Sequence, residues 1–225
     1  MDALLNYGAQ ITAGAVVTLE LAFTSLLFGM MLGIACASAK LSEIRWLRRA
    51  TYLVTNFLRG IPEFLILLIC YFGLSQLLNT YLDGAILISP FSAGVIALSL
   101  IFGAYSSEMF RGAFLAVPVG QMEAARAYGL SRFQMLWFIR LPQASRICLP
   151  SLNNMWQNLL KDTSLVSIVG LEDMLRKANI AAQYTKQPFA FYVAVGVVYF
   201  GFLAISNPTF AWLEKLSGRG YAKQA

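Results

Sequence analysis

Residues 121–142 read QMEAARAYGLSRFQMLWFIRLP and lie between two long apolar parts of the chain. Unlike those parts, they carry four charged side chains, at Glu123, Arg126, Arg132 and Arg140. Charged side chains are costly inside a bilayer, so we expect this stretch at the membrane surface. Its regularly spaced helix signals also argue against an unstructured linker.

The same stretch predicts two short helices that bend at Gly129. Residues 121–128 form the first helix, and the glycine ends it. Ser131 and Gln134 have the spacing of a capping box, which opens the second helix, and Pro142 is expected to stop it. Two short helices joined at a glycine on the face of a membrane protein are typical of a docking element.

The composition indicates an integral membrane protein. Of the 225 residues, 58% are hydrophobic and only 12% are charged, whereas soluble domains carry about 25% charged residues. The length fits one domain, residues 1–225, without a large soluble appendage. A net charge of +6 is compatible with nucleic-acid binding, but in a membrane protein it reflects basic cytoplasmic loops, so we expect no nucleic-acid partner.

Several kinds of chemistry are disfavoured by the residue types. The chain has no histidine, which removes the usual proton shuttle and the commonest metal ligand. Cys36, Cys70 and Cys148 are widely spaced in apolar surroundings, which is typical of small buried hydrophobic residues rather than a disulfide framework or a metal site. The first residues lack the basic segment of a cleaved signal peptide.

The apolar pattern predicts an all-α protein with five transmembrane helices and one cytoplasmic loop between the third and the fourth. The expected spans are about 12–39, 52–82, 86–116, 147–171 and 188–213, and the loop covers 118–146. Pro62 predicts a kink or re-entry within the second span. The fourth span is unusually polar, so one of its sides should face a cavity or a partner.

Basic residues predict the orientation of these spans. Lys and Arg number four in 40–49, five in 111–146 and three in the C-terminal tail, against three in 172–187. Because basic residues favour the cytoplasmic side, the N-terminus is expected outside and the C-terminus in the cytoplasm. The stretch 121–142 is then cytoplasmic.

The spacing within that stretch resembles the EAA loop of ABC importer permeases. The matching positions are Glu123-Ala124-Ala125, Gly129, Ile139 and Leu141-Pro142. Further stretches resemble the polar amino acid uptake permeases, namely RGIPE from Arg59, EMFRGAF from Glu108, KDTSL from Lys161 and GLED from Gly170. The whole-chain pattern is most similar to the permeases for histidine, lysine, arginine and ornithine and for opines.

This resemblance implies a type I importer permease of the bacterial inner membrane. In that family the EAA loop forms coupling helices that dock on a cytoplasmic ABC ATPase homodimer, and an extracytoplasmic binding protein delivers the amino acid to a pair of permeases, often nonidentical. The residues expected to make the ATPase contact are Glu123, Ala124, Ala125, Arg126, Gly129, Leu130 and Arg132.

The energy source is expected in another subunit. The chain has no G-x-x-x-x-G-K-[ST] loop and no Gly-Lys dipeptide, so it lacks the P-loop route to nucleotide binding. ATP and Mg²⁺ would be bound by the partner ATPase, and this chain is expected to hold no cofactor and to be no enzyme. The alternative is a secondary transporter or channel driven by an ion gradient; a receptor or scaffold leaves the helix–glycine–helix spacing unexplained.

The candidate pathway residues are the polar groups at membrane depth, each with a structural alternative. They are Glu20, Glu108, Asn154, Gln157, Asn158, Lys161 and Asp162. Glu108 has a functional interpretation, in which it faces a cationic amino acid, and a structural one, in which it pairs with Arg111 or with a second permease. Glu20 likewise has a functional and a structural interpretation. The amides could bind a zwitterion or join two permeases. Lys161 and Asp162 are adjacent and do not face each other on a helix, so each needs its own partner.

Overall fold

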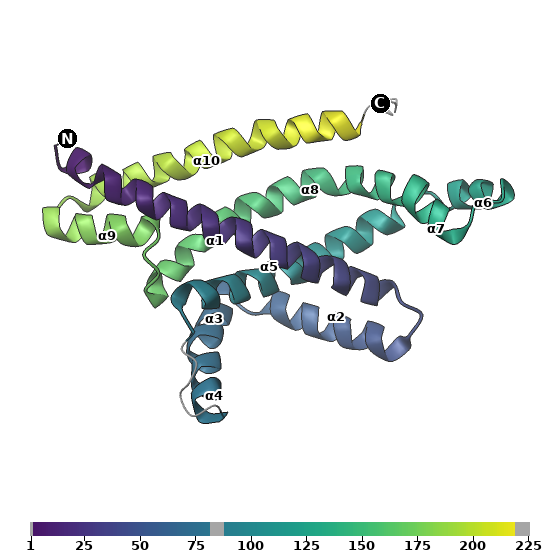
Figure 1. Ribbon diagram of the computed structural model, residues 1–225, viewed down its shortest axis with the longest axis horizontal. Coiled ribbons are helices and arrows are strands. Elements are labelled where there is room, and N and C mark those ends of the chain that lie inside the picture. The colour runs from purple at the N-terminus through teal and green to yellow at the C-terminus, as the bar shows by residue number, and fades with distance from the viewer. Residues whose placement is uncertain (1, 82–87, 219–225) are drawn as a thin grey trace.

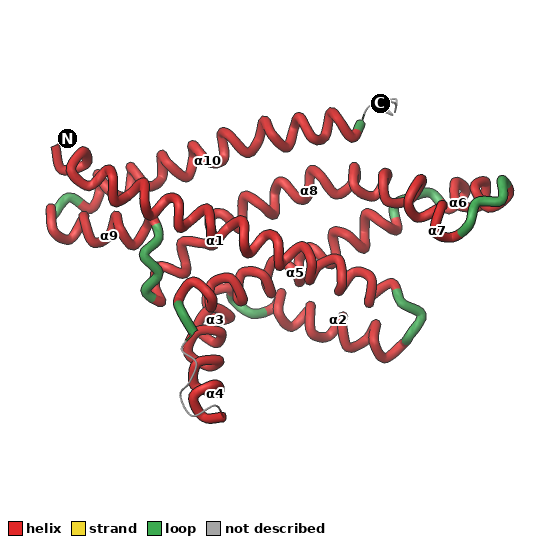
Figure 2. Tube along the Cα trace, in the orientation of Figure 1, coloured by secondary structure: helices red, strands yellow, loops and turns green. Residues whose placement is uncertain are grey.

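The computed structural model describes residues 2–81 and 88–218, and every regular element in these ranges is helical (Figures 1 and 2). The elements in chain order are α1 (Asp2–Leu41), α2 (Arg45–Gly60), α3 (Glu63–Leu68), a π-helical turn (Ile69–Gly73), α4 (Leu74–Tyr81), α5 (Pro90–Leu115), α6 (Val119–Ala127), α7 (Arg132–Met135), a second π-helical turn (Leu136–Arg140), α8 (Leu141–Asp162), a 3₁₀ helix (Thr163–Val169), α9 (Met174–Thr185) and α10 (Pro188–Ser217).

Four helical runs in the described ranges are long and apolar enough to cross a membrane. They are Asn6–Leu41, Glu63–Thr80, Pro90–Leu115 and Pro188–Ser217. The expected spans 12–39, 86–116 and 188–213 correspond to three of these runs. The turn expected around 83–84 lies outside the described residues, as do residues 82, 86 and 87 and the basic tail residues 219 and 223. The prediction of an all-helical membrane protein is confirmed.

The second expected span, 52–82, is divided by a break in the helix. Ile61 has an extended backbone (φ −96°, ψ 140°) because the following proline disfavours the helical conformation at this position. α2 therefore ends at Gly60, and the apolar run begins only at Glu63. The interruption expected at Pro62 is confirmed, but the span starts about eleven residues later than expected.

The fourth expected span, 147–171, also differs from the structure. α8 begins at Leu141, and its polar sequence keeps it out of the four apolar runs. Pro142 lies in the first turn of α8, so the expectation that it stops a helix is wrong. Pro142 is tolerated here for two reasons. The π-helical turn Leu136–Arg140 shifts the backbone hydrogen-bond pattern just before Pro142, and residues in the first turn of a helix need no N–H donor.

The core is built where α1 crosses α5, with α8 against α5 and α2 along the end of α1 (Figure 1). Gly29 and Gly103 allow the close approach of the two backbones. A Cβ at Gly29 would lie 2.9 Å from the side chain of Phe102, and one at Gly103 would lie 2.8 Å from that of Leu32. The two helices therefore pack with their backbones in close contact.

α9 is fixed to the first turns of α1 at the end of the molecule opposite α6 and α7 (Figure 1). Thr18 accepts a hydrogen bond from the backbone N–H of Met174 at 3.2 Å, and the Asp173 carboxylate caps α9 by accepting from the N–H of Arg176 at 2.9 Å. Burial raises the pKa of Asp173 to about 6. Gly14 of α1 packs closely against the start of α9, since a Cβ there would lie 2.8 Å from the backbone of Asp173 and Met174.

We predict that Gly14→Ala destabilises the protein by about 1–3 kcal/mol, because the added methyl group would force two backbones apart. The measurement is the thermal unfolding midpoint of the purified protein in detergent. Gly112→Ala is the matched control, since a Cβ at this helical glycine would meet nothing within 4 Å. Equal midpoints for both variants would contradict the tight contact at Gly14.

Candidate functional site

The stretch 121–142 ends its first helix with a Schellman motif. Gly129 has φ +78°, a conformation that glycine adopts without strain. Its N–H donates to the carbonyl of Arg126 at 3.0 Å, and the N–H of Leu130 donates to the carbonyl of Ala125 at 3.1 Å. The predicted stop at Gly129 is confirmed, with α6 running from Val119 to Ala127.

The second helix opens with the predicted capping box. The Ser131 hydroxyl accepts from the N–H of Gln134 at 3.3 Å, and the Gln134 side chain accepts from the N–H of Ser131 at 2.8 Å. From here the chain is helical through the π turn into α8. The Arg140 side chain lies over the Phe114 ring at 3.9 Å and donates to the Phe114 carbonyl at 3.3 Å, which ties the start of α8 to the end of α5.

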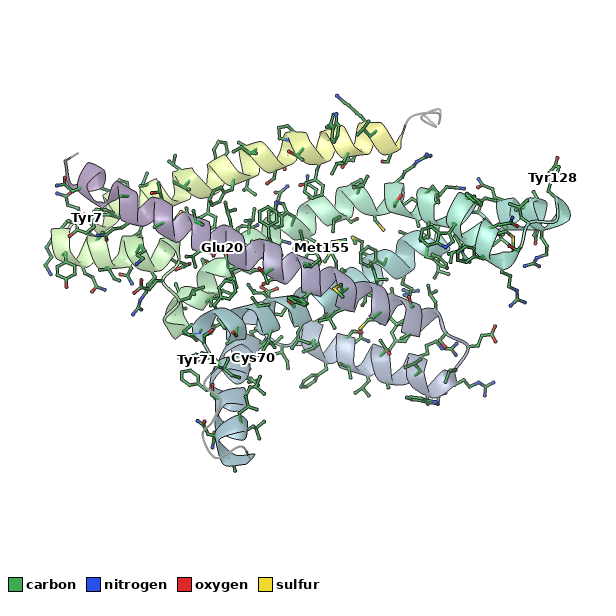
Figure 3. The ribbon with its side chains drawn as sticks, viewed as in Figure 1. Tyr7, Glu20, Cys70, Tyr71, Tyr128 and Met155 are labelled. Carbon is green, nitrogen blue, oxygen red and sulfur yellow. The ribbon has the colours of Figure 1, made fainter. Side chains whose placement is uncertain are left out.

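The residues expected to contact an ATPase lie at the tip of the molecule, and most are exposed. Glu123, Ala124, Arg126, Gly129 and Arg132 are exposed, Leu130 is half-buried and Ala125 is buried. Aromatic residues, which were not expected to take part in this surface, also lie there. Tyr128 is 86% exposed at the tip (Figure 3), and Phe133 and Phe138 are also exposed. A concavity of about 480 Å³ lies beside them, lined by α6 and the start of α8.

Glu108 is neutralised by two cations of its own chain. Its carboxylate lies 2.8 Å from the Lys40 ammonium and 2.7 Å from the Arg111 guanidinium. Lys40, whose side chain is fully buried, also donates to the Ser107 hydroxyl at 2.7 Å and lies 5.2 Å from the centre of the Tyr52 ring. The geometry therefore favours the structural interpretation of Glu108, with Lys40 as the partner that the sequence analysis missed.

A second group of polar residues lines a cavity of about 300 Å³ between α3, α5 and α8. It contains Asn158 and Asp162, two of the expected pathway residues, together with Glu63 and Tyr105, which were not expected. Glu63 and Asp162 thus bring two carboxyl groups to the lining of one cavity. Arg59 lies beside the cavity, with its guanidinium 5.3 Å from the centre of the Tyr105 ring.

The other polar residues of α8 point elsewhere. The amides of Asn153 and Gln157 donate to the side chain of Asn207 on α10, at 3.4 Å and 2.8 Å. Asn154 and Lys161 are exposed and line no part of that cavity. Adjacent Lys161 and Asp162 thus face different surroundings, as expected. Glu20 lies on α1 (Figure 3) and does not line that cavity.

The family of the chain follows from its similarity to known proteins. Residues 29–216 match the family described as binding-protein-dependent transport system inner membrane component. The histidine/lysine/arginine/ornithine transport system permease protein HisQ of Escherichia coli K12 is 40% identical over 94% of this chain and 95% of its own length. The nopaline transport system permease protein NocQ of Agrobacterium fabrum is 41% identical, covering 97% of this chain and 95% of NocQ.

Solved structures agree with this similarity. A crystal structure of an amino acid ABC transporter with histidines contains a chain that is 30% identical, with a TM-score of 0.84 over 94% of this chain and 96% of that one. The MetNI methionine ABC transporter shares the fold, with a TM-score of 0.68 at 18% identity over 94% of this chain and 95% of that one.

The fold is that of an importer permease. The chain belongs to the family of binding-protein-dependent transport system inner membrane components. It is a multi-pass membrane component of an ABC transporter, that is, a transport subunit rather than an enzyme.

We predict that Glu108→Leu lowers the stability of the protein by about 3–5 kcal/mol, because it leaves the buried Lys40 ammonium without its counter-ion. The double change Lys40→Met with Glu108→Leu should recover most of this loss. The thermal unfolding midpoint of the purified protein measures both effects. A normal midpoint with impaired uptake of cationic amino acids would instead favour a direct role of Glu108 in the pathway.

Proposed function

We propose that this chain forms the translocation pathway for polar amino acids with a cationic side chain, and that these pass through the cavity between α3, α5 and α8. The observation that carries the proposal is the pair of carboxyl groups, Glu63 and Asp162, in one cavity at membrane depth. Two carboxylates side by side repel each other in a medium of low dielectric constant. Either a shared proton or a cation relieves that repulsion, and we propose that an ammonium, guanidinium or imidazolium group of the substrate takes this place during transport.

The rest of the cavity fits the other end of an amino acid. Asn158 offers an amide that can donate and accept hydrogen bonds. The Arg59 guanidinium beside Tyr105 has no acidic partner among the described residues and is well suited to bind the α-carboxylate of the substrate. The names of the relatives, which include histidine, lysine, arginine and ornithine, support a substrate that carries both a carboxylate and a positive side chain.

The topology proposed with this function has five membrane crossings, namely the four apolar runs and, in addition, α8. Ser151, Asn154, Asn158 and Lys161 recur every three or four residues on α8 and are all exposed, so lipid is an unsuitable neighbour for that face. We propose that this face lines an aqueous pathway shared with a second permease. The N-terminal end of α1 would lie outside the cell and the α6–α7 tip in the cytoplasm, in agreement with the distribution of basic residues.

The importer would contain four kinds of component. In addition to this chain these are a second permease, a pair of ATPase subunits that binds ATP and Mg²⁺, and an extracytoplasmic binding protein. The α6–α7 tip, defined here as residues 119–135, offers the exposed Glu123, Arg126 and Arg132 around the exposed ring of Tyr128. Charged groups around an aromatic anchor are typical of a protein-binding surface. ATP-driven closure of the ATPases would move this tip.

Removing one of the two cavity carboxylates should weaken the uptake of cationic substrates selectively. We predict that Asp162→Asn raises the KM for arginine about tenfold or more, because a hydrogen bond to a charged group contributes about 1.5–3 kcal/mol. Uptake is measured in proteoliposomes that contain the complete importer and ATP, with ionophores present to collapse proton and sodium gradients. Glu172→Gln is the control, since Glu172 is an exposed carboxylate outside the cavity.

Two results of that assay would contradict the proposal. Equal losses for arginine and for a neutral amino acid would show that Asp162 has no role in recognising a positive charge. Uptake that ends when the ionophores are added would favour the alternative of a transporter driven by an ion gradient.

A change at the glycine of the tip should uncouple ATP hydrolysis from transport. Proline is restricted to φ near −65° and has no N–H, so Gly129→Pro would destroy both the φ of +78° and the hydrogen bond to Arg126. We expect it to abolish ATP-driven uptake while the protein still inserts into the membrane. Gly120→Ala on α6 is the control, because a Cβ there meets nothing within 4 Å. Normal uptake by Gly129→Pro would exclude the tip as the coupling element.

A further inference from the structure

An acidic residue near the middle of an apolar helix has no partner among the residues that the structure describes. Glu20 lies on α1 within about 5 Å of the midpoint of the apolar run Asn6–Leu41, at a rise of 1.5 Å per residue. Its side chain is exposed (Figure 3), and within the described ranges its carboxylate makes no hydrogen bond or ion pair. An ionisable group at this depth is costly unless it is paired or faces water.

Glu20 lies within an otherwise apolar face of α1, between Val16 and Phe23. Val16, Phe23, Leu27, Met31 and Ile34 recur at spacings of three or four residues around it, and each is about half exposed or more. We call these six residues the Glu20 face. Phe23 also contacts Trp156 on α8, with ring centres 5.0 Å apart, so the face continues the surface of the helix bundle.

The exposed face of α10 provides a contrast. Its large exposed residues between 193 and 205 are apolar, including Val197, Phe200 and Ile205, and the charged residues of α10 appear only at its far end, from Glu214. Such a face can contact acyl chains at no electrostatic cost. The Glu20 face cannot, because acyl chains offer no hydrogen-bond donor to a carboxylate.

We infer that the Glu20 face is a contact surface for a second permease chain, which supplies a hydrogen-bond donor or a cation to the Glu20 carboxylate. A helix of a second membrane chain can bring such a donor to this depth while its apolar side chains cover Val16, Leu27 and Met31. Glu20 is then a residue of the assembly and lies outside the substrate cavity. The inference rests on the proposed pairing of two permeases.

The test is a photocrosslinking experiment on the complete importer in membranes. The crosslinker p-benzoylphenylalanine replaces Leu27, which is 60% exposed on the Glu20 face, or Val197, which is 64% exposed on α10, as the control. We expect an adduct between this chain and the second permease from position 27, with a yield at least fivefold above that from position 197. Adducts only with lipid from position 27, or equal yields from both positions, would overturn the inference.

A second measurement tests the carboxylate itself. We expect Glu20→Leu to reduce the recovery of the second permease in purification several-fold, and Glu20→Gln to reduce it less, since an amide oxygen still accepts a hydrogen bond. Val197→Leu should leave the recovery unchanged. Full recovery with Glu20→Leu would show that the Glu20 side chain makes no contact needed for the pairing and would overturn the inference. A complex that never contains two permeases would overturn the proposed function as well.

Discussion

The structure depends on how its polar groups are satisfied inside a bilayer. Hydrocarbon provides neither counter-ions nor hydrogen bonds, so each charge at membrane depth must have a partner or face water. The chain meets this requirement in three ways. Glu108 is neutralised internally by Lys40 and Arg111, Glu63 and Asp162 share a cavity, and we propose that a neighbouring chain provides the partner of Glu20. In this proposal the three groups serve as scaffold, substrate site and assembly contact, respectively.

The helices that connect the α6–α7 tip to the cavity suggest how a displacement of the tip could change the cavity. The chain is helical from Arg132 through the π turn to the end of α8, so the tip and the cavity wall at Asp162 belong to one continuous helical run. Arg140 holds the start of that run to Phe114 at the end of α5. A displacement of the tip would therefore be transmitted to α5 and α8 together, and both line the cavity. α1 crosses α5 through glycine contacts and supports that wall from the other side.

Local features of the chain could be predicted from sequence, and distant pairings could not. Gly129 and the capping box at Ser131 act on their nearest neighbours, so their roles follow directly from spacing. Glu108 pairs with Lys40, 68 residues away, and Asp162 shares a cavity with Glu63, so only the folded bundle brings these residues together. Pro142 was misinterpreted because a π-helical turn, which has no sequence signal of its own, accommodates it.

The central claim is that a cationic amino acid lies between Glu63 and Asp162 during transport. The most direct measurement is a cryo-electron microscopy structure of the complete importer, without nucleotide, at a saturating concentration of arginine. The account predicts density for a guanidinium group between these two carboxyl groups, with the α-carboxylate toward Arg59. Arginine density at another place, such as beside Glu108 or Glu20, with an empty cavity between α3, α5 and α8, would contradict it.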